Sequence, residues 1–235
     1  MSLSAPAEAM DFIAAFNDPQ AAAQYAEGPR RFVPGYEALH RMTAILLAEG
    51  TRPDARVLVL GAGGGQELRA LAEAQPAWTF VGVDPASEML REAARTLGPL
   101  MERVTLVEGY IDDAPPGPFD AATCLLTLHF LEVAERAATV RAIHQRLRPG
   151  APFVAAHGSF PQAEHERPRW LDRYEAYAVA SGADHEQARK ARAAVGSHLP
   201  TLSPEQDADI LREGGFSEVS LFFAAFTWRG WVGRA

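Results

Sequence analysis

Cysteine is nearly missing from this sequence of 235 residues, in which Cys124 stands alone. A single cysteine cannot form a disulfide bond within the chain, so the sequence is not that of a small disulfide-stabilised secreted domain. The first residues, MSLSAPAEAMDF, also lack the basic region followed by an apolar segment that marks a signal peptide. Both absences lead us to expect a cytoplasmic protein.

Basic residues and long apolar runs are scarce as well. Lysine and arginine number 22 against 30 aspartates and glutamates, which gives a formal net charge of −8. Because nucleic-acid binding depends on basic surfaces, we expect no nucleic-acid partner. The most apolar stretch, residues 121–131, is shorter than the roughly 20 residues of a membrane-spanning helix. We therefore expect no membrane partner, and since no histidine pair has ligand spacing with a carboxylate partner, no metal site.

What the sequence does contain is an alternation of apolar strands and amphipathic helices. The expected strands cover residues 56–60, 78–83, 103–107, 119–126 and 152–157, and the helices between them cover residues 66–74, 85–97 and 133–147. Strands that are apolar throughout, separated by helices, indicate a parallel sheet covered on both faces. The pattern predicts an α/β protein with a Rossmann-like, doubly wound sheet.

Both ends of the chain extend this alternation. Before it, we expect helices over 10–16 and 36–49, separated by a basic, aromatic loop that contains Arg30 and Arg31. After it, we expect a helical segment over 162–195, a helix over 204–213 and two strands over 218–223 and 226–232. These two strands are joined too tightly for a helical crossover, so they must pair antiparallel.

The prediction is a single domain, residues 1–235, with seven strands that are mostly parallel and an antiparallel last strand. It comprises a helical cap (1–50), a cofactor-binding core (51–160), a helical lid inserted after strand five (161–200), and a C-terminal helix with the strand pair (201–235).

A glycine-rich loop, Gly61-Ala62-Gly63-Gly64-Gly65, follows the first strand and precedes a helix. Glycines there let the backbone turn sharply and let a ligand approach closely, while the helix N-terminus favours a carboxylate or phosphate. Asp84 ends the second strand, where a carboxylate can accept hydrogen bonds from ribose hydroxyls. Two plainer readings stay open: the glycines form only a tight turn, and Asp84 caps the following helix.

The loop has the spacing G-x-G-x-G and lacks the last glycine of the G-x-G-x-x-G dinucleotide fingerprint, because Gln66 stands there. It resembles motif I of the class I S-adenosylmethionine-dependent methyltransferases, and the resemblance extends from about residue 56 to the C-terminus. That likeness implies S-adenosyl-L-methionine as cofactor and S-adenosyl-L-homocysteine as product. The residues at cofactor positions are Tyr36, Gly61, Ala62, Gly63, Asp84, Pro85, Tyr110, Ile111 and Leu125.

Three segments, 31–36, 126–132 and 222–232, look more narrowly like the carboxy-S-adenosylmethionine synthases. That likeness implies that Tyr36 lies over the ligand and that Arg192 meets an added carboxylate. The chain departs from the subgroup at Tyr110, where an acidic residue is usual, and at Leu125, where asparagine is usual. We therefore predict methyl transfer to a small molecule. Carboxymethyl chemistry on the cofactor and non-catalytic binding of an adenosyl ligand are the alternatives.

Two histidines are candidate general bases. His129 follows strand four and His157 ends strand five, so both fall at the edge of the sheet where ligands bind in this kind of fold. Either histidine could instead be a buried structural residue.

Acceptor contacts are expected from the basic loop and the lid. Arg31 could attract an anionic acceptor or be a solvated charge. Trp170 and Tyr174 share a helix face that could contact the acceptor, pack internally or bury a homodimer contact. With Arg192, these residues are the candidate substrate contacts.

Overall fold

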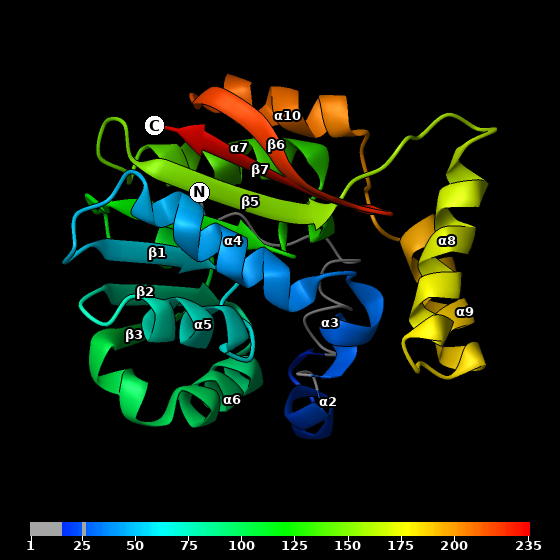
Figure 1. Cartoon of the computed structure of the whole chain (residues 1–235), viewed down its shortest axis with the longest axis horizontal. Coiled ribbons are helices and arrows are strands. Elements are labelled where there is room, and N and C mark those ends of the chain that lie inside the picture. The colour runs from blue at the N-terminus through cyan, green and yellow to red at the C-terminus, as the bar shows by residue number, and fades with distance from the viewer. Residues whose placement is uncertain (1–15, 25–26) are drawn as a thin grey trace.

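The computed structural model describes residues 16–24 and 27–235 and contains a seven-stranded sheet (Figure 1). The strands are β1 (Arg56–Leu60), β2 (Thr79–Asp84), β3 (Val104–Glu108), β4 (Ala121–Leu125), β5 (Pro152–Gly158), β6 (Ser217–Ala225) and β7 (Trp228–Arg234). Their order is β3-β2-β1-β4-β5-β7-β6, and β7 runs antiparallel to both of its neighbours. The predicted doubly wound α/β sheet with an antiparallel last strand is therefore confirmed.

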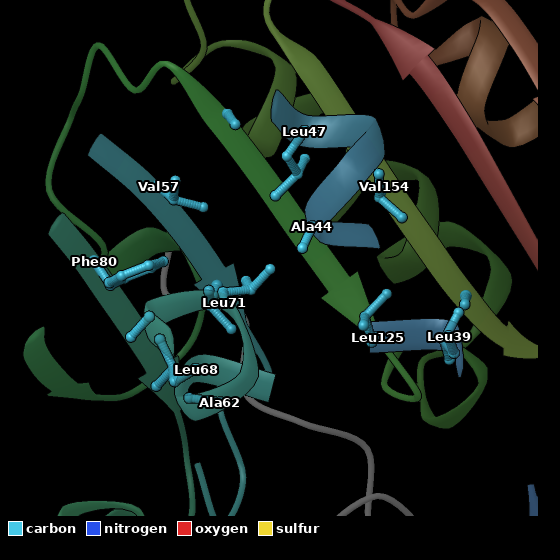
Figure 2. Packing of buried hydrophobic residues seen from close by; sticks show 14 of the residues in the cluster. Leu39, Ala44, Leu47, Val57, Ala62, Leu68, Leu71, Phe80, Leu125 and Val154 are labelled. Atoms are coloured by element: carbon cyan, nitrogen blue, oxygen red, sulfur yellow. The ribbon is translucent and has the colours of Figure 1, made fainter. Parts of the chain in front are cut away.

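Helices cover both faces of this sheet. On one face lie α4 (Tyr36–Ala48), α5 (Gln66–Ala74) and α6 (Ser87–Leu97), whose apolar side chains pack on the five parallel strands β1 to β5. Figure 2 shows Leu39 and Leu47 of α4 and Leu68 of α5 in this layer. On the other face lie α7 (Val133–His144) and α10 (Pro204–Glu213). Because both faces are buried, the strands are apolar throughout, as their sequences indicate.

The strand order reverses between β1 and β4, which are parallel neighbours. In open α/β sheets the ligand binds outside the carboxyl ends of the strands at such a switch point. The glycine-rich loop follows β1, and the loop 126–132 follows β4. The sheet thus brings together two segments that lie far apart in the sequence.

The N-terminal region holds two short helices before α4, namely α2 (Pro19–Gln24) and α3 (Glu27–Phe32). The sequence predicted a loop at Arg30 and Arg31, and that prediction was wrong, because both residues lie in the last turn of α3. Pro29 is tolerated so early in the helix, where its missing N–H has no helical partner to lose. Of the expected helix 10–16, residues 10–15 lie outside the described part of the chain.

The lid consists of two helices, α8 (Arg167–Ala180) and α9 (His185–Ser197), where the sequence predicted one helical segment. The break falls at Gly182, whose φ of 90° lies outside the helical range. Asp184 then caps α9 by accepting hydrogen bonds from the backbone N–H groups of Glu186 and Gln187. Figure 1 shows both lid helices beside the end of the sheet, near α3.

Three short 3₁₀ helices complete the fold: η1 (Gly98–Arg103), η2 (Ile111–Asp113) and η3 (Leu128–Phe130). The last two follow β3 and β4, so they border the same edge of the sheet as the glycine-rich loop. No helix in the described part of the chain has the length and apolar character needed to cross a membrane.

Candidate active site at the carboxyl edge of the sheet

The glycine-rich loop is tightly packed at the switch point. Gly61, Gly63 and Gly65 have φ values of 78°, 48° and 83°, a region that other residues rarely adopt. A Cβ on Gly61 would collide with the side chain of Thr127, and one on Gly65 would lie 2.8 Å from the Ala93 Cα. Close contact with Thr127 and Ala93 thus explains these two glycines. The loop after β1 therefore touches the loop after β4. The loop N–H groups of Gly61, Ala62, Gly63 and Gly65 already donate within the protein, so the N–H groups that can meet a ligand at this edge belong to the first turn of α5.

Asp84 connects the glycine-rich loop to α6. Its Oδ2 accepts a hydrogen bond from the Gly63 N–H at 2.8 Å, and its Oδ1 accepts one from the Ala86 N–H at 2.9 Å. Burial raises the pKa of this carboxyl, and the two hydrogen bonds oppose that shift. The helix-capping interpretation of Asp84 is wrong, because the N-cap of α6 is Ala86 and its helix N–H groups receive no side-chain cap. Each carboxylate oxygen keeps a lone pair for a further donor.

The other candidate cofactor residues lie along the same edge. Pro85 follows β2, Leu125 ends β4, and both Tyr110 and Ile111 follow β3. Ile111 is buried, whereas Tyr110 is 38% exposed. Tyr36 is buried at the start of α4, where its ring meets the His40 ring edge-on at 4.5 Å. The fold thus places all of these residues except Tyr36 at the carboxyl ends of neighbouring strands.

A cavity of about 350 Å³ opens beside the loop that follows β4. Its walls come from four parts of the chain: the N-terminal helices, the ends of β4 and β5, the lid and the β6–β7 turn. The lining residues are Phe16, Gly28, Pro29, Phe32, Val33, Leu126, His129, Phe130, Gly158, Phe160, Tyr174, Ala191, Ala194, Val195, Leu199, Thr201, Thr227 and Trp228. None of them is an aspartate, glutamate, lysine or arginine.

His129 lines this cavity, as expected of a candidate catalytic residue. Its ring lies 4.3 Å from the Phe130 ring and meets the Trp228 ring edge-on at 5.5 Å. The Gly158 backbone N–H donates to its Nδ1 at 3.4 Å, so the neutral ring carries its proton on Nε2. Burial holds the pKa of His129 well below its ordinary value. The imidazole is therefore neutral at physiological pH and is better suited to donate a hydrogen bond than to accept a proton.

His157 lies on the other face of the sheet and does not line the cavity. Its Nε2 is 3.1 Å from the Asp207 Oδ1, and its ring packs at 5.2 Å from the Trp231 ring. Asp207 also pairs with Arg136 at 2.6 Å, and all three side chains are 1% exposed. The structure therefore places His157 in a buried ionic network between β5, α7 and α10.

The candidate substrate contacts also divide into residues that line the cavity and residues that do not. Tyr174 lines the cavity, 5.5 Å from the Phe32 ring. Trp170 does not: it lies between the guanidinium groups of Arg173 and Arg229, at 4.5 and 5.5 Å.

The two arginines proposed as substrate contacts also lie outside the cavity wall. Arg192 pairs with Asp172 at 2.6 Å and with Glu175 at 3.4 Å on α8. Arg31 lies beside the lining residue Phe32 but is not itself part of the wall.

Sequence reasoning missed two residues of this region. Leu126 lines the cavity with a φ of 57°, a strained value for leucine, and no sequence signal marks it. Glu67 lies in the first turn of α5, directly after the glycine-rich loop, and is buried. Acidic residues are common in first turns, so its burial could not be foreseen. Burial raises the pKa of Glu67 to about 8, which keeps it neutral at pH 7.

Among the described residues, no group of three histidine, cysteine, aspartate or glutamate side chains is arranged to hold a metal ion. The polar groups that could bind a ligand here belong to the first turn of α5 after the glycine-rich loop, to Asp84 and to the few polar side chains of the cavity.

Comparison with known proteins agrees with this architecture. Residues 58–153 match a protein family described as a methyltransferase domain. Fold and sequence both agree with the resemblance of the glycine-rich loop to motif I of the class I S-adenosylmethionine-dependent methyltransferases.

Among curated proteins, the chain is similar to carboxy-S-adenosyl-L-methionine synthases. It is 29% identical to the one from Chromohalobacter salexigens, over 91% of this chain and 81% of that protein. It is 22% identical to the one from Staphylococcus epidermidis, over 93% of this chain and 94% of that protein. The narrower resemblance found in the sequence is confirmed.

Solved structures share the fold. Magnesium protoporphyrin IX methyltransferase from Synechocystis PCC 6803, solved with bound S-adenosylmethionine, matches with a TM-score of 0.66 and 15% identity over 99% of both chains. Some matching structures are longer, and this chain spans 62% of two of them and 59% of a third. At such low identity these matches establish the fold alone.

Proposed function

We propose that the chain is an S-adenosylmethionine-dependent methyltransferase that acts on a small molecule. The observation that carries the proposal is the adjacency of two sites at the switch point. The glycine-rich loop packs against Thr127 through Gly61, and the next residue back, Leu126, lines the cavity. A cofactor on the loop and an acceptor in the cavity would meet there.

The residues present suit that cofactor. Backbone N–H groups in the first turn of α5, directly after the glycine-rich loop, would hold its methionyl carboxylate, and Asp84 would accept hydrogen bonds from its ribose hydroxyls. Ile111 and its neighbour Tyr110 would border the adenine. S-adenosylmethionine supplies an electrophilic methyl group on a sulfonium, and transfer of that group leaves S-adenosylhomocysteine. The protein's own part is alignment of the acceptor, exclusion of water by the aromatic rings that line the cavity, and a hydrogen bond from His129 Nε2.

Carboxymethyl chemistry on the cofactor is the second candidate, because the curated relatives carry that name. It would require a cation facing the added carboxylate. In the described part of the chain, Arg192 is instead committed to Asp172 and Glu175, and the cavity wall contains no arginine or lysine. This arrangement favours methyl transfer.

The test is calorimetric titration of the purified protein with S-adenosylhomocysteine. We expect binding, and we expect Asp84→Asn to weaken it about tenfold through loss of charge-assisted hydrogen bonds. Asp54→Asn is the matched control, because Asp54 is an exposed aspartate just before β1, at the opposite end of that strand. Failure of the unmodified protein to bind would refute the proposal.

Product analysis then separates the candidates. Incubation with S-adenosylmethionine and a panel of acceptors, followed by mass spectrometry, should give S-adenosylhomocysteine and a methylated acceptor. The carboxy-S-adenosylmethionine synthases, which the chain resembles, use prephenate in their reaction. Appearance of carboxylated S-adenosylmethionine on addition of prephenate would establish the second candidate. Tight binding without turnover on any acceptor would indicate a non-catalytic ligand-binding protein.

Four expectations from the sequence stay predictions. They are the organisation of residues 1–235 as one domain, a cytoplasmic location, the lack of a nucleic-acid partner and a possible homodimer. The net charge of −8 supports the lack of a nucleic-acid partner, and the single cysteine suits a cytoplasmic location.

A further inference from the structure

The polar side chains of the cavity gather around the end of β5. The Gly158 N–H donates to His129 Nδ1 at 3.4 Å, and the Ser159 N–H donates to the Thr227 carbonyl at 2.8 Å. Ser159 also pairs with Leu202, the neighbour of Thr201. These contacts place His129, Thr201 and Thr227 along one wall, which we call the polar wall.

Two hydroxyls of the polar wall are unused within the described structure. The Oγ1 atoms of Thr201 and Thr227 are buried and have no hydrogen-bond partner among the described residues. Thr227 is 2% exposed, so bulk water does not compensate it freely. A buried hydroxyl without a partner is destabilising, which makes such a group at a cavity wall a sign of a ligand that supplies the partner.

The rest of the cavity presents an aromatic wall. Tyr174 lies between Phe32 and Trp228, with ring centroids at 5.5 and 6.5 Å. Trp228 donates its indole N–H to the Phe32 carbonyl at 2.9 Å, so this polar group is already occupied and the ring is fixed. Aromatic rings held in this way favour a flat, apolar partner through stacked or edge-to-face contacts.

The lack of charged side chains in the cavity wall narrows the class of ligand further. No lining residue in the described part of the chain is acidic or basic by side chain, apart from the neutral His129. An ionised ligand would have to lose its water without gaining a counter-charge, which is strongly unfavourable. The cavity volume of about 350 Å³ lies at the small end for ligand sites and suits one or two fused rings.

We propose that this cavity binds an uncharged aromatic ring that bears a hydroxyl or carbonyl group. The ring lies against the aromatic wall, and its oxygen meets Thr227, Thr201 and His129. The inference rests on the proposed function, for which such a ring is the methyl acceptor. The acceptor's hydroxyl oxygen bonds to the methyl carbon as the carbon–sulfur bond of S-adenosylmethionine breaks, S-adenosylhomocysteine is the leaving group, and the hydroxyl proton is released to solvent. It names the acceptor class that the sequence left open.

The experiment is calorimetric binding of 2-naphthol, 2-naphthoate and cyclohexanol to the full chain, with and without saturating S-adenosylhomocysteine. We expect 2-naphthol to bind at least tenfold more tightly than either of the other two probes. Thr227→Val, which removes the hydroxyl at nearly constant volume, should weaken 2-naphthol binding about fivefold. Thr227→Ser should restore it, because the hydroxyl returns.

Thr43→Val is the matched control. Thr43 is also fully buried with an unpartnered Oγ1, but it lies in α4 and does not line the cavity. This variant should bind 2-naphthol as the unmodified protein does. Circular dichroism and thermal melting confirm that each threonine variant is folded before its affinity is interpreted.

The outcomes separate this inference from the proposed function. If S-adenosylhomocysteine binds but 2-naphthoate or cyclohexanol binds as tightly as 2-naphthol, the inference is overturned alone. An unchanged 2-naphthol affinity in folded Thr227→Val would overturn it as well. If 2-naphthol is selected while S-adenosylhomocysteine does not bind, the inference stands and the proposed function fails.

Discussion

The two candidate histidines lie in different surroundings on opposite sides of the sheet. His129 lies in an apolar cavity among aromatic rings, next to hydroxyls that have no partner among the described residues. His157 lies among charged groups, beside Asp207 and Arg136. His129 follows β4, His157 lies near the end of β5, and both were candidate bases. The difference shows that the face of the sheet, more than residue type or strand end, decides what such a histidine can do.

The network around His157 also supports the cavity indirectly. Arg136 donates to the Pro200 carbonyl at 2.7 Å, and Pro200 lies between two lining residues, Leu199 and Thr201. A rigid ionic cluster behind the sheet thus fixes one edge of the cavity in front of it. The cavity itself gains little stability from its polar groups, so the two regions should respond differently to substitution.

The largest effect is expected from Asp207→Ala. Removal of this carboxylate leaves Arg136 buried without its ionic partner, which should lower the free energy of unfolding by about 3–5 kcal/mol. Asp209→Ala on the same helix is the control, because Asp209 pairs with Arg212 on the surface and its loss should cost less than about 1 kcal/mol. Urea denaturation measures both. Equal losses of unfolding free energy in the two variants would show that the buried ionic network stabilises the fold no more than a surface ion pair does.

A pH dependence of opposite sign is expected from two buried carboxyls. Burial would raise the pKa of Asp207, but the charges of His157 and Arg136 hold it at about 2, so its contribution is present above about pH 4 and is lost as pH falls through 2. Glu67 behaves in reverse, since its pKa rises from 4.5 to about 8 on folding.

Glu67→Gln should therefore reduce the change in the free energy of unfolding with pH between about 4.5 and 8. In the unmodified protein, Glu67 lowers the free energy of unfolding by about 1.4 kcal/mol per pH unit as pH rises from 4.5 towards 8. The glutamine variant has no group to ionise there. Denaturation at pH 5, 6, 7 and 8 checks this, and parallel profiles for the two proteins would contradict the assignment.

A paired substitution of the histidines sharpens the comparison directly. His157→Phe should lower the free energy of unfolding by about 1–3 kcal/mol, because Asp207 loses a polar contact. His129→Phe should stay within about 1.5 kcal/mol of the unmodified protein, because it replaces one ring by another in an apolar site. The binding assay should show the reverse order, with only His129→Phe weakening 2-naphthol.

The smallest effect is expected from Arg192→Ala. Its pairs with Asp172 and Glu175 are partly exposed, so the loss of stability should remain below about 1 kcal/mol. Binding of S-adenosylhomocysteine and of 2-naphthol should be unchanged. A variant that no longer forms carboxylated S-adenosylmethionine, where the unmodified protein does, would instead place Arg192 in the site of the second candidate.

The sequence by itself determined the sheet and the sheet edge at which we propose the cofactor site. Apolar strands, amphipathic helices and glycines are local signals, because each depends on the immediate neighbours of a residue in the chain. They gave the order of elements, the position of the glycine-rich loop and the placement of Asp84. The differences from the structure were also local. The sequence predicts a loop at Pro29, which lies in α3, and it does not predict the helix break at Gly182 in the lid.

Tertiary structure alone decided which side chains face the cavity. His129 and His157 carry the same local signal, but the alternation of β5 and the packing of α7 and α10 send His157 to the far face. The unused Thr227 hydroxyl and the strained Leu126 depend on contacts between segments distant in sequence. The proposed acceptor class rests on those contacts, since a cavity exists only where separate parts of the chain meet.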